Sequence, residues 1–318
     1  MRPSLPVLLL CALFGATSLA NAASGRVFVS NEQGDSVSVI DPTSYAVVKT
    51  IAVGKRPRGI GLAPDGSAVY VAVSGANHIA VIDPRTLEVV RTFPSGDDPE
   101  AFAVHQNGNI YISNEEDAKA SVIDPHDGKL VAEIEVGIEP EGVAISPDGT
   151  RAIVTSESTN MLHIIAIPEH TIAANIVVGA RPRAATFSAD GKLAYATSEI
   201  SGEVKKVDVA SGKILGRMPL SNDQAKPKDI LVSRDGKQLY VAGGRANRVF
   251  VLDAQSLEIV REIGVGKRVW GLALSRDGKR LLTTDGADHQ VSVIDTAQYE
   301  VIKTIAVGQF PWGIVIDD

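Results

Sequence analysis

Charged and aromatic residues alternate at one position of a phrase that recurs along this chain. The phrase appears as "VGKRPRGIGLAPDG" and "VGIEPEGVAISPDG", and the position in question follows its first proline. From copy to copy the occupants are Arg58, Glu100, Glu141, Arg183, Lys228, Trp270 and Trp312. Guanidinium groups bind carboxylates through paired hydrogen bonds, and indole faces stack on flat rings. The arginines and tryptophans of this set are therefore suited to holding a planar anion.

A second variable position lies two residues earlier. Its occupants are Arg56, Asp98, Glu139, Arg181, Lys226, Arg268 and Phe310. Acidic residues are confined to two consecutive copies, "DDPE" and "IEPE", whereas the other five copies are basic or aromatic. If the copies close into a ring, the last copy lies beside the first, and the basic and aromatic residues form one continuous arc. The alternative interpretation is a solvated loop face, with the two tryptophans plugging a central channel.

The position that follows the first column carries small residues, with one exception. Gly59, Ala101, Gly142, Ala184, Gly271 and Gly313 fit this pattern, and Asp229 breaks it. Asp229 is either a partner of Lys228 and its neighbours or a ligand contact. Further carboxylates on the same face would come from Glu32, Glu115, Glu116, Asp117, Glu157 and Glu199. These could recruit a cation or a basic partner, but solubility explains them equally well.

The elements that must position these residues are short strands. The apolar phrase "VSVID" and its variants end at Asp41, Asp83, Asp124, Asp208, Asp253 and Asp295, at spacings of 42, 41, 84, 45 and 42 residues. The missing copy is "LHIIA", which ends at Ala166. Each unit contains four runs rich in valine and isoleucine, separated by turn residues such as Asp65-Gly66, which indicates antiparallel hairpins. Seven four-stranded units predict an all-β, seven-bladed β-propeller in a single domain.

The two ends of the chain predict how the ring closes. The first unit begins at its second strand, "GRVFVSN", and the chain finishes with a lone first strand, "WGIVID". We expect these segments to complete one blade by pairing the N-terminal strands with the C-terminal strand. Such closure removes the sheet edges that would otherwise invite aggregation. The first strand of each blade would be innermost, so that the variable columns surround the mouth of the channel.

The N-terminus predicts export. Arg2 precedes the apolar run "LPVLLLCALFGA", and Ala20-Asn21-Ala22 offers a small-residue cleavage site, which is the pattern of a signal peptide over residues 1–22. The propeller domain then spans residues 23–318. Cys11 is the only cysteine, so the mature chain would contain no disulfide. We expect a periplasmic monomer with no membrane span.

The repeat resembles that of the YVTN-type β-propellers over nearly the whole mature chain. "VYVAVSGANHIAVIDPRTLEVVRTF" followed by "VGKRPRGIGLAPDG" carries the resemblance. As a single-domain exported form, the chain is most similar to propellers associated with pyrroloquinoline-quinone-dependent alcohol catabolism. The resemblance implies a binding or accessory role, with the quinone as a ligand or its dehydrogenase as a redox partner. Related propellers also include lactonases and lyases, so the resemblance leaves activity open.

Motifs for catalysis and cofactors are absent from the sequence. It contains no haem-attachment, His-Glu-x-x-His, Gly-x-Ser-x-Gly or phosphate-loop motif, and its six histidines fall in different columns. We therefore predict no catalytic, cofactor-binding or metal residues, and favour a binding protein over an enzyme. If the protein is a lactonase or lyase, Glu100, Glu141 and Asp229 are the candidate acids and bases. Single-stranded nucleic-acid binding is a third alternative, but the formal net charge of −7 disfavours it.

The predicted ligand site is the mouth of the channel. It is expected to hold an anionic small molecule or a periplasmic redox protein. The residues assigned to it are Arg56, Arg58, Glu100, Glu141, Arg181, Arg183, Lys228, Asp229, Arg268, Trp270, Phe310 and Trp312.

Overall fold

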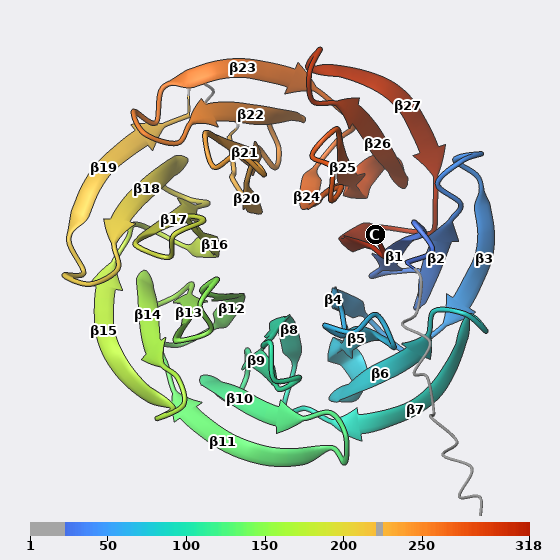
Figure 1. Ribbon diagram of the computed structural model, residues 1–318, viewed down its shortest axis with the longest axis horizontal. Coiled ribbons are helices and arrows are strands. Elements are labelled where there is room, and N and C mark those ends of the chain that lie inside the picture. The colour runs from blue at the N-terminus through green and yellow to red at the C-terminus, as the bar shows by residue number, and fades with distance from the viewer. Residues whose placement is uncertain (1–22, 221–224) are drawn as a thin grey trace, which may run out of the picture.

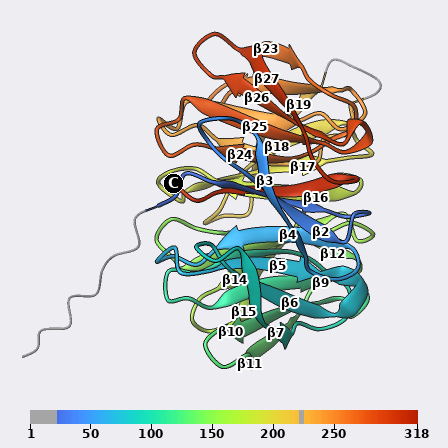
Figure 2. The ribbon, with the colours of Figure 1, turned by 90° about the vertical axis from the view of Figure 1, so that its right-hand side faces the viewer.

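Seven antiparallel sheets of four strands surround a central axis in the computed structural model, which describes residues 23–220 and 225–318 (Figure 1). This arrangement confirms the predicted seven-bladed β-propeller. Figure 2 gives the same disc from its side. The predicted signal peptide, residues 1–22, lies outside the described residues.

We letter the strands of each blade A to D from the axis outward, and number the blades 1 to 7 from the one that contains the N-terminal strands. The A strands are β28 (Pro311–Ile316), β4 (Pro57–Leu62), β8 (Pro99–Val104), β12 (Pro140–Ile145), β16 (Pro182–Phe187), β20 (Ile230–Val232) and β24 (Val269–Leu274). The B strands are β1 (Val27–Asn31), β5 (Val69–Val73), β9 (Ile110–Asn114), β13 (Arg151–Ser156), β17 (Leu193–Ser198), β21 (Gln238–Ala242) and β25 (Arg280–Asp285).

The two outer strands follow in the same order. The C strands are β2 (Ser36–Ile40), β6 (His78–Asp83), β10 (Lys119–Asp124), β14 (Met161–Ala166), β18 (Glu203–Asp208), β22 (Arg248–Asp253) and β26 (Gln290–Asp295). The D strands are β3 (Val47–Ala52), β7 (Glu88–Pro94), β11 (Lys129–Glu135), β15 (Thr171–Val177), β19 (Ile214–Pro219), β23 (Ile259–Gly264) and β27 (Glu300–Ala306). Two short 3₁₀ turns, Ser74–Ala76 and Gly286–Asp288, follow β5 and β25.

The apolar core lies between neighbouring blades. Strands B and C are buried on both faces, whereas the D strands are largely exposed. Phe28 and Val37 of blade 1 pack in one cluster with Val69 and Val71 of blade 2, and equivalent clusters recur around the ring. The continuous valine and isoleucine runs of strands B and C are therefore explained by burial from both sides.

The ends of the chain close blade 1 as expected. Strand β28 pairs with β1 in the antiparallel sense, with Val27 opposite Ile316 and Val29 opposite Ile314. Beyond the strand, the Asp317 carboxylate accepts hydrogen bonds from the backbone N–H and the hydroxyl of Ser24, at 3.0 and 2.6 Å. The C-terminal strand thus supplies the innermost strand that the N-terminal segment lacks.

A β-bulge lies at the start of the A strand in six of the seven blades. In blade 2, Pro57 faces Val73 and Ile60 faces Val71, so strand A has one residue more than strand B between these pairs. The same shift occurs in blades 1, 3, 4, 5 and 7. A bulge re-aims the side chains beside it. The two residues inside each bulge are the charged or aromatic residue of the first column and the small residue that follows it.

Hydroxyl groups on strand B hold five of these six bulges in place and join each of the five to the next blade. Thr284 Oγ1 accepts a hydrogen bond from Gly271 N–H at 2.7 Å and donates one to Trp312 O at 2.8 Å. The same position in other blades carries Ser30, Ser113, Thr155 and Thr197, which bond to the carbonyl groups of Arg58, Glu141, Arg183 and Lys228. We call these five residues the hydroxyl column.

The small residue of the bulge is dictated by the same close approach. A Cβ atom built on Gly142 would lie 2.5 Å from Arg183 O, and one built on Gly313 would lie 2.7 Å from Arg58 O. Neighbouring blades therefore meet backbone to backbone at the mouth. This contact fixes the position of the first-column residues.

We predict that Thr284→Val lowers the free energy of unfolding by about 1–3 kcal/mol, because it leaves the partly buried Gly271 N–H and Trp312 carbonyl without their partner while conserving side-chain shape. Urea denaturation measures the change. Thr50→Val, at an exposed position of β3, should alter stability by less than about 0.5 kcal/mol. Equal effects of the two substitutions would contradict the clamping role of the hydroxyl column.

Candidate functional site: the channel mouth

The residues of the second variable column lie in the D–A loops, which connect strand D of one blade to strand A of the next, and they share one backbone conformation. Arg56, Asp98, Glu139, Arg181, Arg268 and Phe310 all adopt positive φ, between 50° and 58°. The N–H groups of all but Glu139 donate to side chains in the B–C loop of the preceding blade: Asn160 Oδ1 accepts from Arg181 N at 3.1 Å, and Asn247 Oδ1 accepts from Arg268 N at 3.0 Å. These contacts compensate the cost of the left-handed conformation.

The same loops hold the B–C carboxylates in place. The backbone N–H of Glu115 donates to Asp98 O at 3.0 Å, and that of Glu199 donates to Arg181 O at 2.8 Å. Glu32 and Glu157 are held in the same way by Phe310 and Glu139. Four of the six acidic residues noted in the B–C loops therefore lie at the mouth. Glu116 and Asp117 are exposed, and the Asp117 carboxylate accepts the Asp97 N–H.

Arg58 lies in a group of carboxylates from blades 1 and 3. Its guanidinium contacts Glu32 at 3.0 Å, forms an ion pair with Glu100, and lies 3.8 Å from Glu115. The Glu100 side chain is fully buried. An arginine of the expected basic arc thus already has acidic partners, and they include the first-column residue of the next blade.

Arg183 and Lys228 are likewise compensated by carboxylates. Arg183 lies 3.1 Å from Glu141, pairs with Glu157, and lies 3.6 Å from Glu199. Lys228 forms a hydrogen-bonded ion pair with Glu141, which comes from blade 4, two blades away. Burial lowers the pKa of Arg183 to about 10 and lowers that of Lys228, whereas nearby carboxylates, first among them Glu199 for Arg183 and Asp229 for Lys228, oppose the fall.

The two tryptophans stack at the mouth, with cations on their faces. Their ring centroids are 6.4 Å apart at an interplanar angle of 25°. The Lys228 ammonium lies 5.1 Å from the Trp270 centroid and 4.8 Å from that of Trp312, close enough for cation–π attraction. The guanidinium groups of Arg183 and Arg268 lie 5.5 and 4.9 Å from Trp270. Contacts along the ring thus unite five of the seven first-column residues, Glu141, Arg183, Lys228, Trp270 and Trp312, into one cluster.

A cavity of about 280 Å³ lies in the channel next to this cluster. Glu141, Arg183, Lys228 and the two tryptophans line one part of it, and the remainder is lined mainly by apolar A-strand residues. Its volume is close to the lower end of small-molecule sites, roughly 300–1,000 Å³. The channel is therefore not completely filled by its own side chains.

Asp229 lines this cavity and is not the ion-pair partner of Lys228, which pairs with Glu141 instead. Its carboxylate accepts backbone N–H groups of Ile230 and Leu272, both at 2.8 Å. Burial raises the pKa of Asp229 to about 6, although these hydrogen bonds and Lys228 oppose the rise. Asp229 and Lys228 still favour each other's charged forms, so both alternatives for Asp229, the partner role toward Lys228 and its neighbours and the ligand role, stay predictions.

Basic residues without acidic partners occur in one sector of the rim. Among residues 23–220 and 225–318, no ion pair joins Lys226, Arg245 or Arg268 to a carboxylate. With Glu199, Gly244 and Trp270 they line one shallow pocket. We call Lys226, Arg245 and Arg268 the basic sector. Phe310, the remaining aromatic residue, instead packs against His289, with centroids 5.4 Å apart.

Two structural features of the site were missed in the sequence. The hydroxyl column recurs at about 42-residue spacing on every blade except 2 and 6, so its periodicity was a usable signal. The loop residues that clamp the second column include Asp35, Asn77, Asn160, Asn247 and His289. Their chemistry varies, which hides the pattern. Arg245 belongs to no predicted column, and only the fold brings it to the rim.

The fold and its channel mouth define a seven-bladed β-propeller, and comparison with known families agrees. A YNCE-like β-propeller model matches residues 3–102, and a model described as a seven-bladed lactonase propeller matches residues 143–300. The chain is therefore similar to YNCE-like and lactonase propellers over these two segments. No curated protein is significantly similar to it. The described part of the chain holds no helix with the length and apolar character of a membrane span.

Solved structures share the fold at low sequence identity. A chain of hydrazine synthase from Kuenenia stuttgartiensis is 22% identical, with a TM-score of 0.78 over 89% of this chain and 98% of that one. A functionally unknown protein from Desulfotomaculum acetoxidans is 17% identical, with a TM-score of 0.80 over 92% and 99% of the two chains. These similarities establish architecture and leave the role of the mouth open.

We predict that Asp229 makes stability fall as the pH rises from about 4 to 6. Because its folded-state pKa is about 6 rather than 3.8, the folded state binds more protons than the unfolded state in this window. The loss has an upper limit of about 3 kcal/mol, reduced by water in the channel. Urea denaturation between pH 4 and 7 should show that the stability of the unmodified protein falls relative to Asp229→Asn.

Asp65→Asn is the control. Hydrogen bonds from Ser67 lower the pKa of this exposed turn residue, so its ionised form favours folding. Relative to Asp65→Asn, the unmodified protein should gain stability as the pH rises only below about 4, and the difference should be nearly constant between pH 5 and 7. A pH-independent difference between the unmodified protein and Asp229→Asn would contradict a perturbed carboxyl at the channel.

Proposed function

We propose that this protein is a periplasmic binding or accessory protein that holds a planar anionic small molecule at the mouth of the propeller channel. The observation that carries the proposal is the basic sector beside Trp270. Arg268 covers one indole ring at 4.9 Å, and Lys226 and Arg245 line the same pocket. None of the three has a carboxylate partner among the described residues, in contrast to Arg58, Arg183 and Lys228.

The ligand that fits this sector carries carboxylates on a flat ring system. Exposed guanidinium and ammonium groups attract carboxylates, and the ring stacks beside the indole. Pyrroloquinoline quinone, a planar tricarboxylate, has this chemistry, and the resemblance to propellers associated with quinone-dependent alcohol catabolism favours it as the first probe. Stacking contributes about 1–3 kcal/mol per ring, so a few such contacts support micromolar affinity.

Intrinsic fluorescence offers a specific test because both tryptophans of the protein lie in the site. Titration with pyrroloquinoline quinone, corrected for its absorbance, should change the emission with a dissociation constant in the micromolar range. We expect Arg268→Gln to weaken binding by about tenfold or more, since it removes a charge and a stacked group. Raising the ionic strength should also weaken binding.

Arg276→Gln is the matched control, because Arg276 is also exposed but lies in the A–B turn of blade 7, on the opposite face. It should leave the affinity unchanged. A fluorescence signal that stays flat up to millimolar quinone, or equal affinities in the two variants, would contradict the proposal.

A second candidate, a hydrolase of lactones, is favoured by the pair Lys228 and Asp229 in the cavity. A carboxyl with a pKa of about 6 is suited to general acid–base catalysis near neutral pH. The match of residues 143–300 to a lactonase propeller model adds to this candidate. Hydrolysis of a sugar lactone, followed with a pH indicator, should then fall by about 10²- to 10⁴-fold in Asp229→Asn. Hydrolysis at the uncatalysed rate by the unmodified protein would exclude this candidate.

A further inference from the structure

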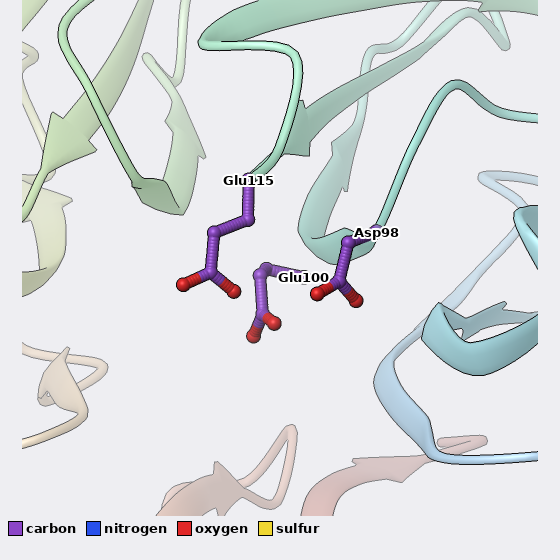
Figure 3. A group of neighbouring side chains, drawn as sticks. All are labelled: Asp98, Glu100 and Glu115. Carbon is purple, nitrogen blue, oxygen red and sulfur yellow. The ribbon is translucent and has the colours of Figure 1, made fainter.

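Three carboxylates converge on the side of the mouth that lies across from the basic sector. Oxygen atoms of Asp98, Glu100 and Glu115 all lie within 4.8 Å of one another. Figure 3 shows the three side chains extending from separate points of the backbone toward a common space. Asp98 precedes β8, Glu100 lies in its bulge, and Glu115 follows β9. The hydrogen bond from Glu115 N to Asp98 O holds two of these positions together.

The centre of this group has unsatisfied oxygen atoms. Glu100 is 0% exposed, and its Oε1 forms the ion pair with Arg58. Its Oε2 has no hydrogen-bond partner among the described residues, and neither does the buried Oδ1 of Asp98. A buried carboxylate oxygen without a partner costs several kcal/mol, and such atoms in native proteins commonly face an ion or an ordered water.

The charge balance around these atoms is negative. Arg58 and Arg56 are the cations in contact with the group, whereas Glu32, Asp98, Glu100 and Glu115 supply four carboxylates. Two negative charges therefore remain uncompensated. The group around blade 4 differs, because its three carboxylates, Glu141, Glu157 and Glu199, are matched by three cations, Arg181, Arg183 and Lys228. The excess is thus local to blades 2 and 3.

We propose that Asp98, Glu100 and Glu115 bind a divalent cation, with calcium preferred. All three ligands are carboxylate oxygens, which suit hard cations. Calcium–oxygen distances of about 2.3–2.6 Å place two ligands of one ion up to about 5 Å apart, which matches the spacing of this group. Calcium also tolerates the irregular geometry of ligands from two loops and a strand, with water completing its shell. Its double charge neutralises the local excess.

Arg58 sets a limit on the affinity. Its guanidinium occupies Glu100 Oε1 and also contacts Glu32, so the cation binds on the Oε2 side. Repulsion between the guanidinium and the ion makes binding weaker than in sites made of carboxylates alone. We therefore expect a dissociation constant of about 10⁻⁴–10⁻³ M, in the range of extracellular calcium modules.

Isothermal titration calorimetry of the chain, treated with EDTA and then dialysed free of it, tests the proposal. Calcium chloride should give a saturable signal, and magnesium chloride a weaker one. Asp98→Asn should weaken calcium binding by about tenfold or more, because it removes one charged ligand. Asparagine accepts the positive φ of this position, so the loop conformation is retained. Glu139→Gln, in the same column one blade further, should leave binding unchanged.

Two results would overturn the proposal: no saturable binding of either ion up to about 5 mM, or equal calcium affinity in Asp98→Asn and Glu139→Gln. If Asp98→Asn does not fold, Glu115→Gln replaces it, since Glu115 is partly exposed. Mn²⁺ paramagnetic resonance gives a second readout of occupancy. Arg268→Gln should keep full calcium binding, so failure of the anion site and failure of the cation site are distinguishable.

Discussion

The close approach of the A strands at the axis is the constraint on which the mouth depends. Each bulge turns one charged or aromatic side chain toward the channel, and the backbone N–H of the small residue that follows needs a hydrogen-bond partner where neighbouring blades meet closely. A hydroxyl of the hydroxyl column accepts a hydrogen bond from this N–H. The same hydroxyl donates a hydrogen bond to a carbonyl group of the next blade. Blade packing and site geometry are therefore one feature, since the atoms that fix a first-column residue also join two blades.

That constraint explains why the charges at the mouth compensate one another. Side chains brought so close to the axis lose hydration, and an isolated buried charge is very costly. Arg58, Arg183 and Lys228 are tolerated because carboxylates from other blades surround them. The tryptophan faces contribute further, since Lys228 lies near both rings. The mouth is thus a network of ion pairs rather than a ring of free charges.

The fold was predictable from the sequence because its signals are local and repeated. Seven copies of one pattern fix the strands and turns, and the incomplete first and last copies fix how the ring closes. The pairing of Lys228 with Glu141 was not predictable, since the residues are 87 positions apart and belong to blades that are not neighbours. The order of the repeats gives the position of each residue around the ring. It does not show which side chains reach across the channel to contact each other. The same limit applies to Asp229, whose partners are backbone N–H groups.

These contacts also change the interpretation of the basic and aromatic arc that was predicted from the order of the two columns. By formal charge alone, the D–A loops that follow blades 2 and 3, "DDPE" and "IEPE", are acidic, and the other D–A loops are basic or aromatic. Among the described basic residues of the two columns, only Lys226 and Arg268 have no carboxylate partner, and Arg245 lies beside them, whereas blades 2 and 3 keep an excess of carboxylates. We therefore expect an anion and a cation to be attracted to different halves of one rim. Because field strength depends on charges left uncompensated, pairing and not composition decides what each half can bind.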